Sequence, residues 1–243
     1  MFTKVFAHRG ASGYAPENTL PSFKRAYEME ADGIETDVHL TKDHVPVLIH
    51  DEHVRRTTNG KGWIKDLTMN ELKTLDAGSW FSPEFAGTTM LTLEEFFTWI
   101  QHKPLRINLE LKNNKIDYPH LEAKVYEVIE QFQLQDRIIL STFNPHSLQR
   151  LQKWFPHVER ALLTSKRNKY LIQYAKELNV QALHIKYNLL APQLVEKSHR
   201  ENIAVRVFTV NRTNQMLHCL KQKCDGFFTD FPAHAVKVRK IYQ

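Results

Sequence analysis

The sequence has too few cysteines for a disulfide-rich fold. The only two, Cys219 and Cys224, are five positions apart near the C-terminus. Two cysteines do not form a disulfide framework, and without a second pair they make a poor zinc site. We expect both to be reduced, structural thiols, as is typical of proteins in a reducing compartment.

Long apolar runs are also lacking. No stretch approaches the roughly 18 apolar residues that a membrane-spanning helix requires. The first ten residues contain no apolar run that resembles the core of a secretory signal. We therefore expect a cytoplasmic protein without stable membrane anchoring.

Several common ligand-binding motifs are missing too. There is no Walker-type loop, no G-x-G-x-x-G and no G-x-S-x-G, so nothing predicts a nucleotide-binding loop or a serine nucleophile. The net charge of +6 favours anionic ligands, whether phosphate substrates, nucleic acid or lipid headgroups. The basic residues are scattered, however, and form no long block of the kind that binds nucleic acid.

What the sequence does contain is an alternation of short β-branched runs and helix-like stretches, which is typical of a parallel sheet with crossover helices. The length of 243 residues fits one (β/α)₈ barrel, which typically needs about 250 residues. The expected strands are Val5–Ala7, Gly33–Val38, Pro46–His50, Arg106–Leu111, Ile138–Thr142, Arg160–Thr164, Ala182–Lys186, Ala204–Val210 and Gly226–Thr229. These are nine candidates for eight places, and the sequence does not indicate which one lies outside the barrel.

Two connections depart from a regular barrel. The link from Val38 to Pro46 is too short for a helix and predicts an extended return or a hairpin. The segment 51–103 is far longer than the usual connection of about 2–6 residues and contains its own helix signals and aromatic residues. Long insertions at the rim of a barrel are usually functional, so we interpret this segment as a small cap over the site.

Polar residues stand at the ends of the expected strands, where active sites of such barrels lie. Glu35 and Asp37 are two residues apart in "IETDV" and therefore point to the same face of the strand, as do Glu110 and Lys112 in "LELK". If these faces meet, three carboxylates converge and are suited to Ca²⁺ or Mg²⁺. The alternative is a buried salt-bridge network of the carboxylates with Lys112 and Arg9.

Two of the thirteen histidines, His8 and His50, end apolar strands in the region of these carboxylates. Two imidazoles with near-neutral pKa values can act as general base and general acid, although the sequence does not say which is which. Arg9, beside His8, is suited to grip phosphate oxygens or to pair with Glu17 or Glu35.

The other histidines carry weaker signals. His184 lies in a strand-like run, and we expect it in the core or the barrel wall. The histidines expected at the surface are His39, His44, His53, His102, His120 and His157.

Six segments taken together resemble the glycerophosphodiester phosphodiesterase family. They are "AHRG" with "PENT" nearby, "IETDV", "PVLIHD", "LELK", "FTVN" and "DGFFTDFP". They follow the family's order from His8 to Pro232, which is nearly the whole chain. Within the insertion, "TTNGKGWIKDLT", "LDAGSWFSPEFAG" and "LTLEE" are similar to the cap of bacterial members.

The resemblance implies a single domain over residues 1–243, a (β/α)₈ barrel with the cap inserted at about 51–103, between the third and fourth expected strands. It also implies roles for individual residues. The acid–base residues would be His8 and His50, and the metal ligands Glu35, Asp37 and Glu110. Arg9 and Lys112 would contact the phosphate.

The implied reaction is the metal-dependent hydrolysis of a glycerophosphodiester, such as glycerophosphocholine or glycerophosphoethanolamine, to sn-glycerol 3-phosphate and an alcohol. The implied partner is a small-molecule phosphodiester substrate, not nucleic acid. The family's "WTVN" is "FTVN" here, so Phe208 stands where a tryptophan lines the substrate site. Phenylalanine keeps an aromatic wall but has no indole N–H donor, which bears on substrate preference.

Some alternatives stay open at this point. The same scaffold suits a lysophospholipase D-like or phosphoinositide-type phosphodiesterase, and an apolar entrance formed by the aromatic residues of the insertion would favour the former. A non-catalytic phosphate-binding module would not need both histidines and all three carboxylates. Ca²⁺ or Mg²⁺ as the ion, the alcohol headgroup, and a monomer or a homodimer are not distinguished.

Overall fold

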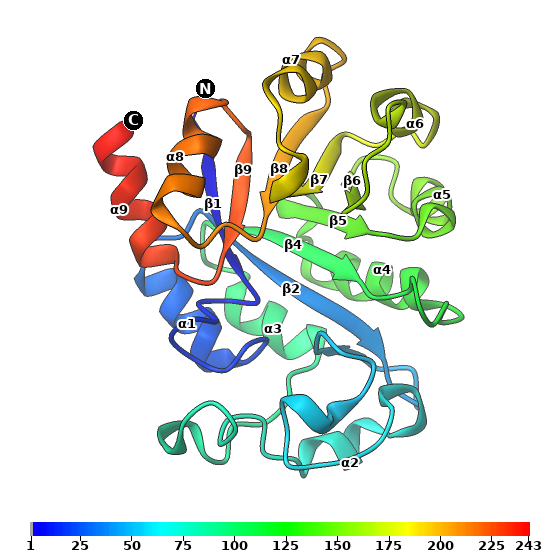
Figure 1. Ribbon diagram of the computed structural model, residues 1–243. Helices are drawn as coiled ribbons and strands as arrows, with labels where there is room; N and C mark the ends of the chain where they lie inside the picture. Colours follow the sequence, from blue (N-terminus) through cyan, green and yellow to red (C-terminus); the bar gives the residue numbers. More distant parts are fainter. Residues whose placement is uncertain (1) are drawn as a thin grey trace.

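Eight parallel strands form a closed barrel in the computed structural model, which describes residues 2–243 (Figure 1). Around the barrel the order is β1-β2-β4-β5-β6-β7-β8-β9, and β9 pairs with β1. With β3, which lies outside the barrel, the strands are β1 Lys4–His8, β2 Gly33–Leu40, β3 Pro46–Leu48, β4 Arg106–Leu111, β5 Ile138–Thr142, β6 Glu159–Thr164, β7 Ala182–Lys186, β8 Ala204–Phe208 and β9 Gly226–Thr229. The predicted (β/α)₈ barrel is confirmed.

β3 is therefore the ninth candidate strand, the one without a place in the barrel. It pairs antiparallel with β2, with Val38 opposite Leu48, which confirms the hairpin expected after Val38. The candidate strand Pro46–His50 is thus not part of the barrel, because a link this short allows only an antiparallel return. The return nevertheless brings the chain after Leu48 back along β2 toward the mouth of the barrel, where the backbone N–H of Ile49 donates to the carbonyl of Asp37.

Helices surround the barrel, and α2 lies apart from it in the cap (Figure 1). The helices are α1 Leu20–Glu28, α2 Met69–Lys73, α3 Leu93–Ile100, α4 Leu121–Phe132, α5 Pro145–Trp154, α6 Leu171–Glu177, α7 Pro192–Arg200, α8 Thr213–Lys221 and α9 Pro232–Tyr242. Short 3₁₀ turns are η1 Val54–Arg56, η2 Ile64–Asp66, η3 Pro83–Phe85, η4 Gln135–Arg137 and η5 Tyr187–Leu189. His120, which precedes α4, has a left-handed backbone (φ 69°), and the helix begins directly after it.

The segment 51–103 divides between two hydrophobic cores. α3 contributes its buried face to the main core, where the Phe96 ring lies 4.6 Å from that of Phe23 in α1. The cap has a small core of its own, made of Val47, Ile49, Val54, Ile64, Met69, Leu72, Ala77 and Met90. α3 is thus the outer helix that leads into β4, and the part of the segment with a separate core precedes it.

The barrel interior contains ion pairs at the amino ends of the strands, a small apolar cluster above them and polar side chains at the carboxyl ends. At the amino ends of the strands, Glu159 binds two cations, Arg106 at 2.9 Å and Arg206 at 2.6 Å. Above them lies a small apolar cluster that includes Phe6 and Phe228. This packing fills the lower barrel and leaves its carboxyl end for polar side chains.

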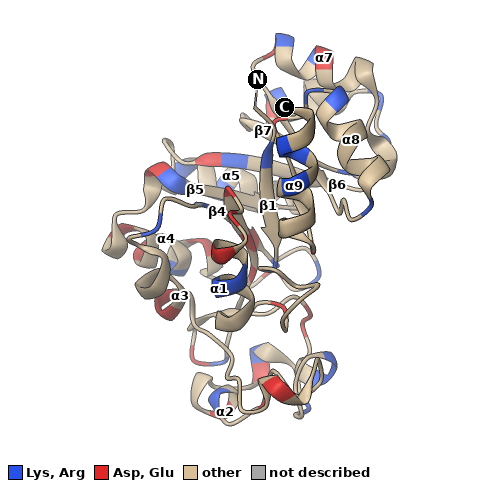
Figure 2. Ribbon diagram, turned by 90° about the vertical axis from the view of Figure 1, so that its left-hand side faces the viewer, with Lys and Arg blue, Asp and Glu red and all other residues tan. Residues whose placement is uncertain are grey.

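Charged residues are distributed over the whole described chain, with Lys and Arg interspersed among Asp and Glu (Figure 2). Of the helices in residues 2–243, none has both the length and the apolar character required to cross a membrane.

The packing of α3 predicts which of its residues support the barrel. Phe96→Ala should lower the free energy of unfolding by about 3–5 kcal/mol, since it leaves a cavity against Phe23 and its neighbours. Thr98→Ala, on the exposed face of the same helix, should change it by less than about 0.5 kcal/mol. Urea unfolding of the two variants measures both values, and equal losses would contradict the placement of α3.

Candidate active site

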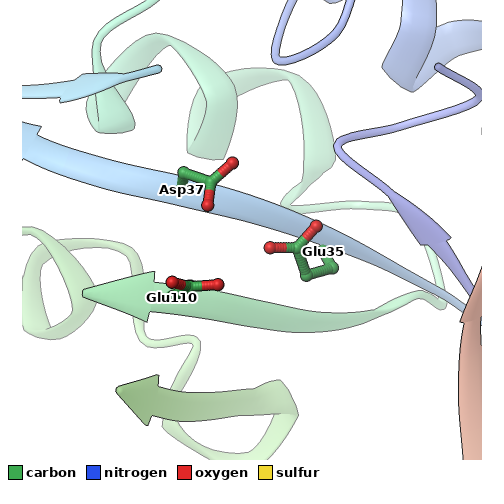
Figure 3. A group of neighbouring side chains, drawn as sticks. All are labelled: Glu35, Asp37 and Glu110. Carbon is green, nitrogen blue, oxygen red and sulfur yellow. The ribbon is translucent and has the colours of Figure 1, made fainter. Parts of the chain in front are cut away.

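Three carboxylates meet at the carboxyl end of the barrel. Glu35 and Asp37 extend from β2 and Glu110 from β4, and their carboxyl groups point toward one another (Figure 3). One oxygen from each lies within 4.8 Å of the other two. The register explains this, because Asp37 is directly opposite Glu110 and Glu35 lies one pleat below on the same face.

Two of the three carboxylates, Glu35 and Asp37, have strongly shifted pKa values. Burial raises the pKa of Glu35 to about 8, and the negative charge of Asp37 adds to this effect. Burial also opposes ionisation of Asp37, but nearby Lys112 and Arg9 hold the pKa of that carboxyl well below its usual range. Glu35 therefore needs an additional positive charge to be ionised at neutral pH.

Lys112 and Arg9 contact the carboxylates but leave one buried carboxylate oxygen without a hydrogen bond. Lys112 Nζ lies 2.7 Å from Glu110 Oε1 and 3.6 Å from Asp37 Oδ1, and Arg9 Nε lies 3.4 Å from Asp37 Oδ2. The salt-bridge network considered as an alternative is thus partly present. Asp37 Oδ1 is nevertheless buried with no hydrogen-bond partner among the described residues. An unpartnered buried carboxylate oxygen within an all-oxygen donor set fits a hard divalent cation.

His8 is held from one side by Asp230. Its Nδ1 lies 2.7 Å from Asp230 Oδ1, and Asp230 also accepts a hydrogen bond from Ser12 Oγ at 3.0 Å. Burial alone would lower the pKa of His8, but this hydrogen bond and the charge of Glu35 raise it above its ordinary value. The partner at Nδ1 turns the opposite ring nitrogen, Nε2, away from Asp230.

His50 is held in the same way by its neighbour in the sequence. Its Nδ1 lies 2.6 Å from Asp51 Oδ1. Asp51 in turn accepts from Arg56 Nε at 2.7 Å, and Arg56 makes a two-pronged contact with Glu17 at 2.7 and 2.8 Å. Glu17 also accepts from Arg9 Nη1 at 2.8 Å, so a continuous chain of charges runs from His50 to the carboxylates.

Two asparagines fix the site's aspartates in the same manner. Asn18 donates to Asp37 Oδ2 at 2.9 Å, and its carbonyl oxygen accepts from the Thr36 hydroxyl at 2.7 Å. Asn211 donates to Asp230 Oδ2 at 2.6 Å, and its carbonyl oxygen accepts from the Thr229 hydroxyl at 3.2 Å and from the Asp230 N–H at 3.0 Å. In each aspartate the asparagine binds Oδ2. Oδ1 of Asp230 is directed toward His8, and Oδ1 of Asp37 toward Glu110 and Lys112.

His39 is not at the surface, contrary to expectation. Its side chain is fully buried, with Nδ1 2.9 Å from the Tyr118 hydroxyl and Nε2 3.1 Å from the carbonyl oxygen of His50. Burial lowers the pKa of His39 to about 4, so it is a neutral hydrogen-bonding group at physiological pH. His39 points inward because β2 is covered on both faces.

The remaining predicted positions also face the barrel's carboxyl end. Phe208 ends β8, packs edge-on against Phe143 and lines a cavity together with His8, Glu35 and Glu110. His184 is buried in the interior of the barrel and lines the same cavity.

Comparison with known proteins agrees with this geometry. The profile of the glycerophosphoryl diester phosphodiesterase family matches residues 8–234. The chain belongs to this family. The phosphoric diester hydrolase predicted from the resemblance is confirmed.

Relatives of this phosphodiesterase match it along their full lengths. A glycerophosphodiester phosphodiesterase of Caldanaerobacter subterraneus is 42% identical over 99% of both chains. That of Bacillus altitudinis is 43% identical over 98% of both. The solved structure of an Oleispira antarctica phosphodiesterase in complex with the product sn-glycerol-3-phosphate has a TM-score of 0.92 at 32% identity, covering 98% of this chain and 97% of the other.

Some residues of the phosphodiesterase site were not predicted from the sequence. Asp51 and Asp230 lie in segments that carried the family resemblance, and the pattern D-G-x-x-T-D occurs at both 32–37 and 225–230. This repeat is a signal that Asp37 and Asp230 occupy equivalent places at strand ends. Arg56 had no such signal, because it lies in an irregular turn whose position depends on the cap.

The contact between His8 and Asp230 makes a titration prediction for the phosphodiesterase. Asp230→Asn keeps the size of the side chain but removes the negative charge that raises the pKa of His8, so this pKa should fall. NMR titration of the histidine ring protons in the presence of a chelator measures it. His102, which is exposed, serves as the internal control, and its ring-proton signals should be the same in both proteins. An unchanged His8 would mean that Asp230 does not set its protonation.

Proposed function

We propose that the enzyme hydrolyses glycerophosphodiesters in a metal-dependent reaction, releasing sn-glycerol 3-phosphate and an alcohol such as choline or ethanolamine. The observation that carries this proposal is the set of three carboxylate oxygens within 4.8 Å, with an aspartate-bound histidine on either side. The product bound in the Oleispira antarctica relative supports sn-glycerol 3-phosphate as the product.

In this proposal Glu35, Asp37 and Glu110 hold one divalent cation, Ca²⁺ or Mg²⁺. When bound, the cation would supply Lewis-acid stabilisation of the substrate's phosphate and hydroxyl oxygens. The donor set supports a hard cation because it is entirely carboxylate oxygen. Asn18 holds Asp37 in the orientation that this binding requires.

Arg9 and Lys112 bind the phosphate. Both are nearly buried, and Lys112 keeps its charge because nearby Glu110 and Asp37 outweigh the effect of burial and raise its pKa. Fixed cations in a site of low dielectric stabilise the charge that develops on the phosphate oxygens in the transition state. The planar guanidinium of Arg9 suits two phosphate oxygens at once.

His8 and His50 transfer protons. Asp230 and Asp51 accept the Nδ1 protons, which leaves Nε2 of each ring to take or give a proton at the substrate. One imidazole would remove the proton of the nucleophile while the other protonates the leaving alcohol. This pairing serves equally for attack by water or by the glycerol 2-hydroxyl through a cyclic phosphate.

Further assignments complete the proposal. We place the enzyme in the cytoplasm, which is supported by two free, buried cysteines. Residues 1–243 form a single domain in which the cap covers the site, and a homodimer stays a prediction. Phe208 lines the substrate site as an aromatic wall.

A coupled assay for sn-glycerol 3-phosphate tests the proposal. The purified enzyme should release it from glycerophosphocholine or glycerophosphoethanolamine when Ca²⁺ or Mg²⁺ is present, and excess chelator should abolish the release. Equal rates with chelator would refute the metal role. A strong preference for lysophosphatidylcholine over every water-soluble diester would instead favour the lysophospholipase D-like alternative.

Replacing either histidine should remove most of the turnover. His8→Ala and His50→Ala should each lower kcat by about 100-fold or more, the usual size of a general acid or base contribution. His102→Ala, at an exposed histidine, is the matched control and should retain full activity. Steady-state kinetics with glycerophosphocholine measure the effect, and a loss below threefold for either site variant would exclude that residue as acid or base.

The carboxylates make a separate prediction for metal binding. Glu35→Gln preserves shape but removes a charged ligand, and should weaken the binding of Ca²⁺ or Mg²⁺ by at least about tenfold. Isothermal titration with the metal alone measures this without reference to turnover. Glu94→Gln, at an exposed carboxylate, should leave the affinity unchanged. Unchanged affinity in Glu35→Gln would place the ion elsewhere.

A further inference from the structure

A small cavity of about 30 Å³, enough for one or two water-sized groups, lies inside the barrel next to Glu35 and Glu110. Its walls include Glu35, Glu110 and His8 from the proposed site, and the apolar side chains of Leu163, Phe208 and Phe228. Two further polar residues line it, His184 from β7 and Asn108 from β4. Neither of them has a role in the proposed mechanism.

His184 presents a hydrogen-bond donor without a partner. Arg206 Nη1 lies 3.2 Å from its Nε2, and a guanidinium can only donate, so Nε2 is the acceptor. Burial and the charge of Arg206 lower the pKa of His184 well below its usual value, which keeps the ring neutral. The single ring proton is therefore on Nδ1. This atom is buried and has no hydrogen-bond partner among residues 2–243.

Asn108 presents the complementary acceptor. Its amide nitrogen donates to the Ser141 hydroxyl at 3.0 Å. Its carbonyl oxygen, Oδ1, is buried and also has no partner among the described residues. The side chains of Asn108 and His184 are 1% and 0% exposed, so solvent outside the protein does not satisfy them. A buried polar atom left unpaired costs about 1–3 kcal/mol.

We propose that this cavity binds a small neutral hydroxyl-bearing group that donates to Asn108 Oδ1 and accepts from His184 Nδ1. The group is either a hydroxyl of the substrate's glycerol arm or one or two water molecules. A hydroxyl is the group that can both donate and accept. If the hydroxyl belongs to the substrate's glycerol arm, the assignment rests on the proposed function; if it belongs to water, it does not.

The two unpaired atoms favour a neutral hydroxyl over other small ligands. A carboxylate or a phosphodiester has no hydrogen to donate to Asn108 Oδ1, and a metal ion has no acceptor for the Nδ1–H of His184. The apolar walls of Phe208, Phe228 and Leu163 suit the carbon atoms of an alcohol.

Crystallography of the unmodified enzyme decides the proposal. Crystals are grown without added ligand and with sn-glycerol 3-phosphate as the probe. We expect an oxygen atom within hydrogen-bond distance of Asn108 Oδ1 and of His184 Nδ1, belonging to water in the first crystal and to water or the probe in the second. A cavity without an ordered oxygen in both crystals would overturn the proposal, whether or not the enzyme hydrolyses glycerophosphodiesters.

Kinetics identify the source of the hydroxyl. Asn108→Leu removes the acceptor, and Ile139→Val is the matched control because Ile139 is opposite Asn108 in the sheet but outside the cavity lining. The substrates are glycerophosphocholine and an analogue with propane-1,2-diol in place of glycerol, which lacks the terminal hydroxyl. If the substrate supplies the hydroxyl, Asn108→Leu lowers kcat/KM about 10-fold for the first and less than twofold for the analogue. If water supplies it, the variant affects both substrates equally.

These outcomes are distinguishable from failure of the proposed function. That failure would appear as no release of sn-glycerol 3-phosphate by the unmodified enzyme from any glycerophosphodiester. The crystallographic result does not depend on turnover. Should Asn108→Leu not fold, Asn108→Asp retains an acceptor oxygen in the cavity, and the crystals of the unmodified enzyme still decide.

Discussion

The repulsion among three neighbouring carboxylates is the constraint around which the carboxyl end of this barrel is organised. Glu35, Asp37 and Glu110 lie close together, and burial together with the charge of Asp37 raises the pKa of Glu35. Lys112 and Arg9 supply two positive charges, which do not balance three carboxylates. A divalent cation would leave a small positive excess, and such a site attracts the single negative charge of a phosphodiester.

Two residues beside the carboxylates have strained backbone conformations. Arg9 and Asn18 both have left-handed backbones, with φ of 55° and 56°, which non-glycine residues rarely adopt. The turn at Arg9 points its backbone N–H to Glu35 Oε2 at 2.8 Å. The buried Asn18 side chain holds Thr36 and Asp37. Contacts with Glu35, Thr36 and Asp37 thus stabilise both conformations, as surrounding contacts commonly do at functional sites.

Local patterns predicted the barrel, and in the site they predicted the residues that share a strand. Alternation along β2 and β4 was enough to bring Glu35, Asp37 and Glu110 together, because the register of parallel strands follows from burial. Two other placements depend on contacts distant in sequence. His39 follows the site on β2 but is covered by Tyr118, 79 residues away. Arg56 reaches Glu17, 39 residues away, only because the segment that contains Arg56 packs against the loop after β1. The hydrophobic pattern of a short stretch of sequence carries no information on contacts between residues this far apart.

His50 shows why the cap is part of the site. His50 is not on a barrel strand, and its position is set by the residues around it. Ile49 and Val54, on either side of it in the chain, are buried in the core of the cap, and His39 binds its carbonyl oxygen from β2. Asp51 and Arg56 then connect it to Glu17 and Arg9 at the end of β1. Because the imidazole is held from the cap and the carboxylates from the barrel, their alignment requires both parts to be folded. The barrel strands alone would present the three carboxylates and His8 but not His50.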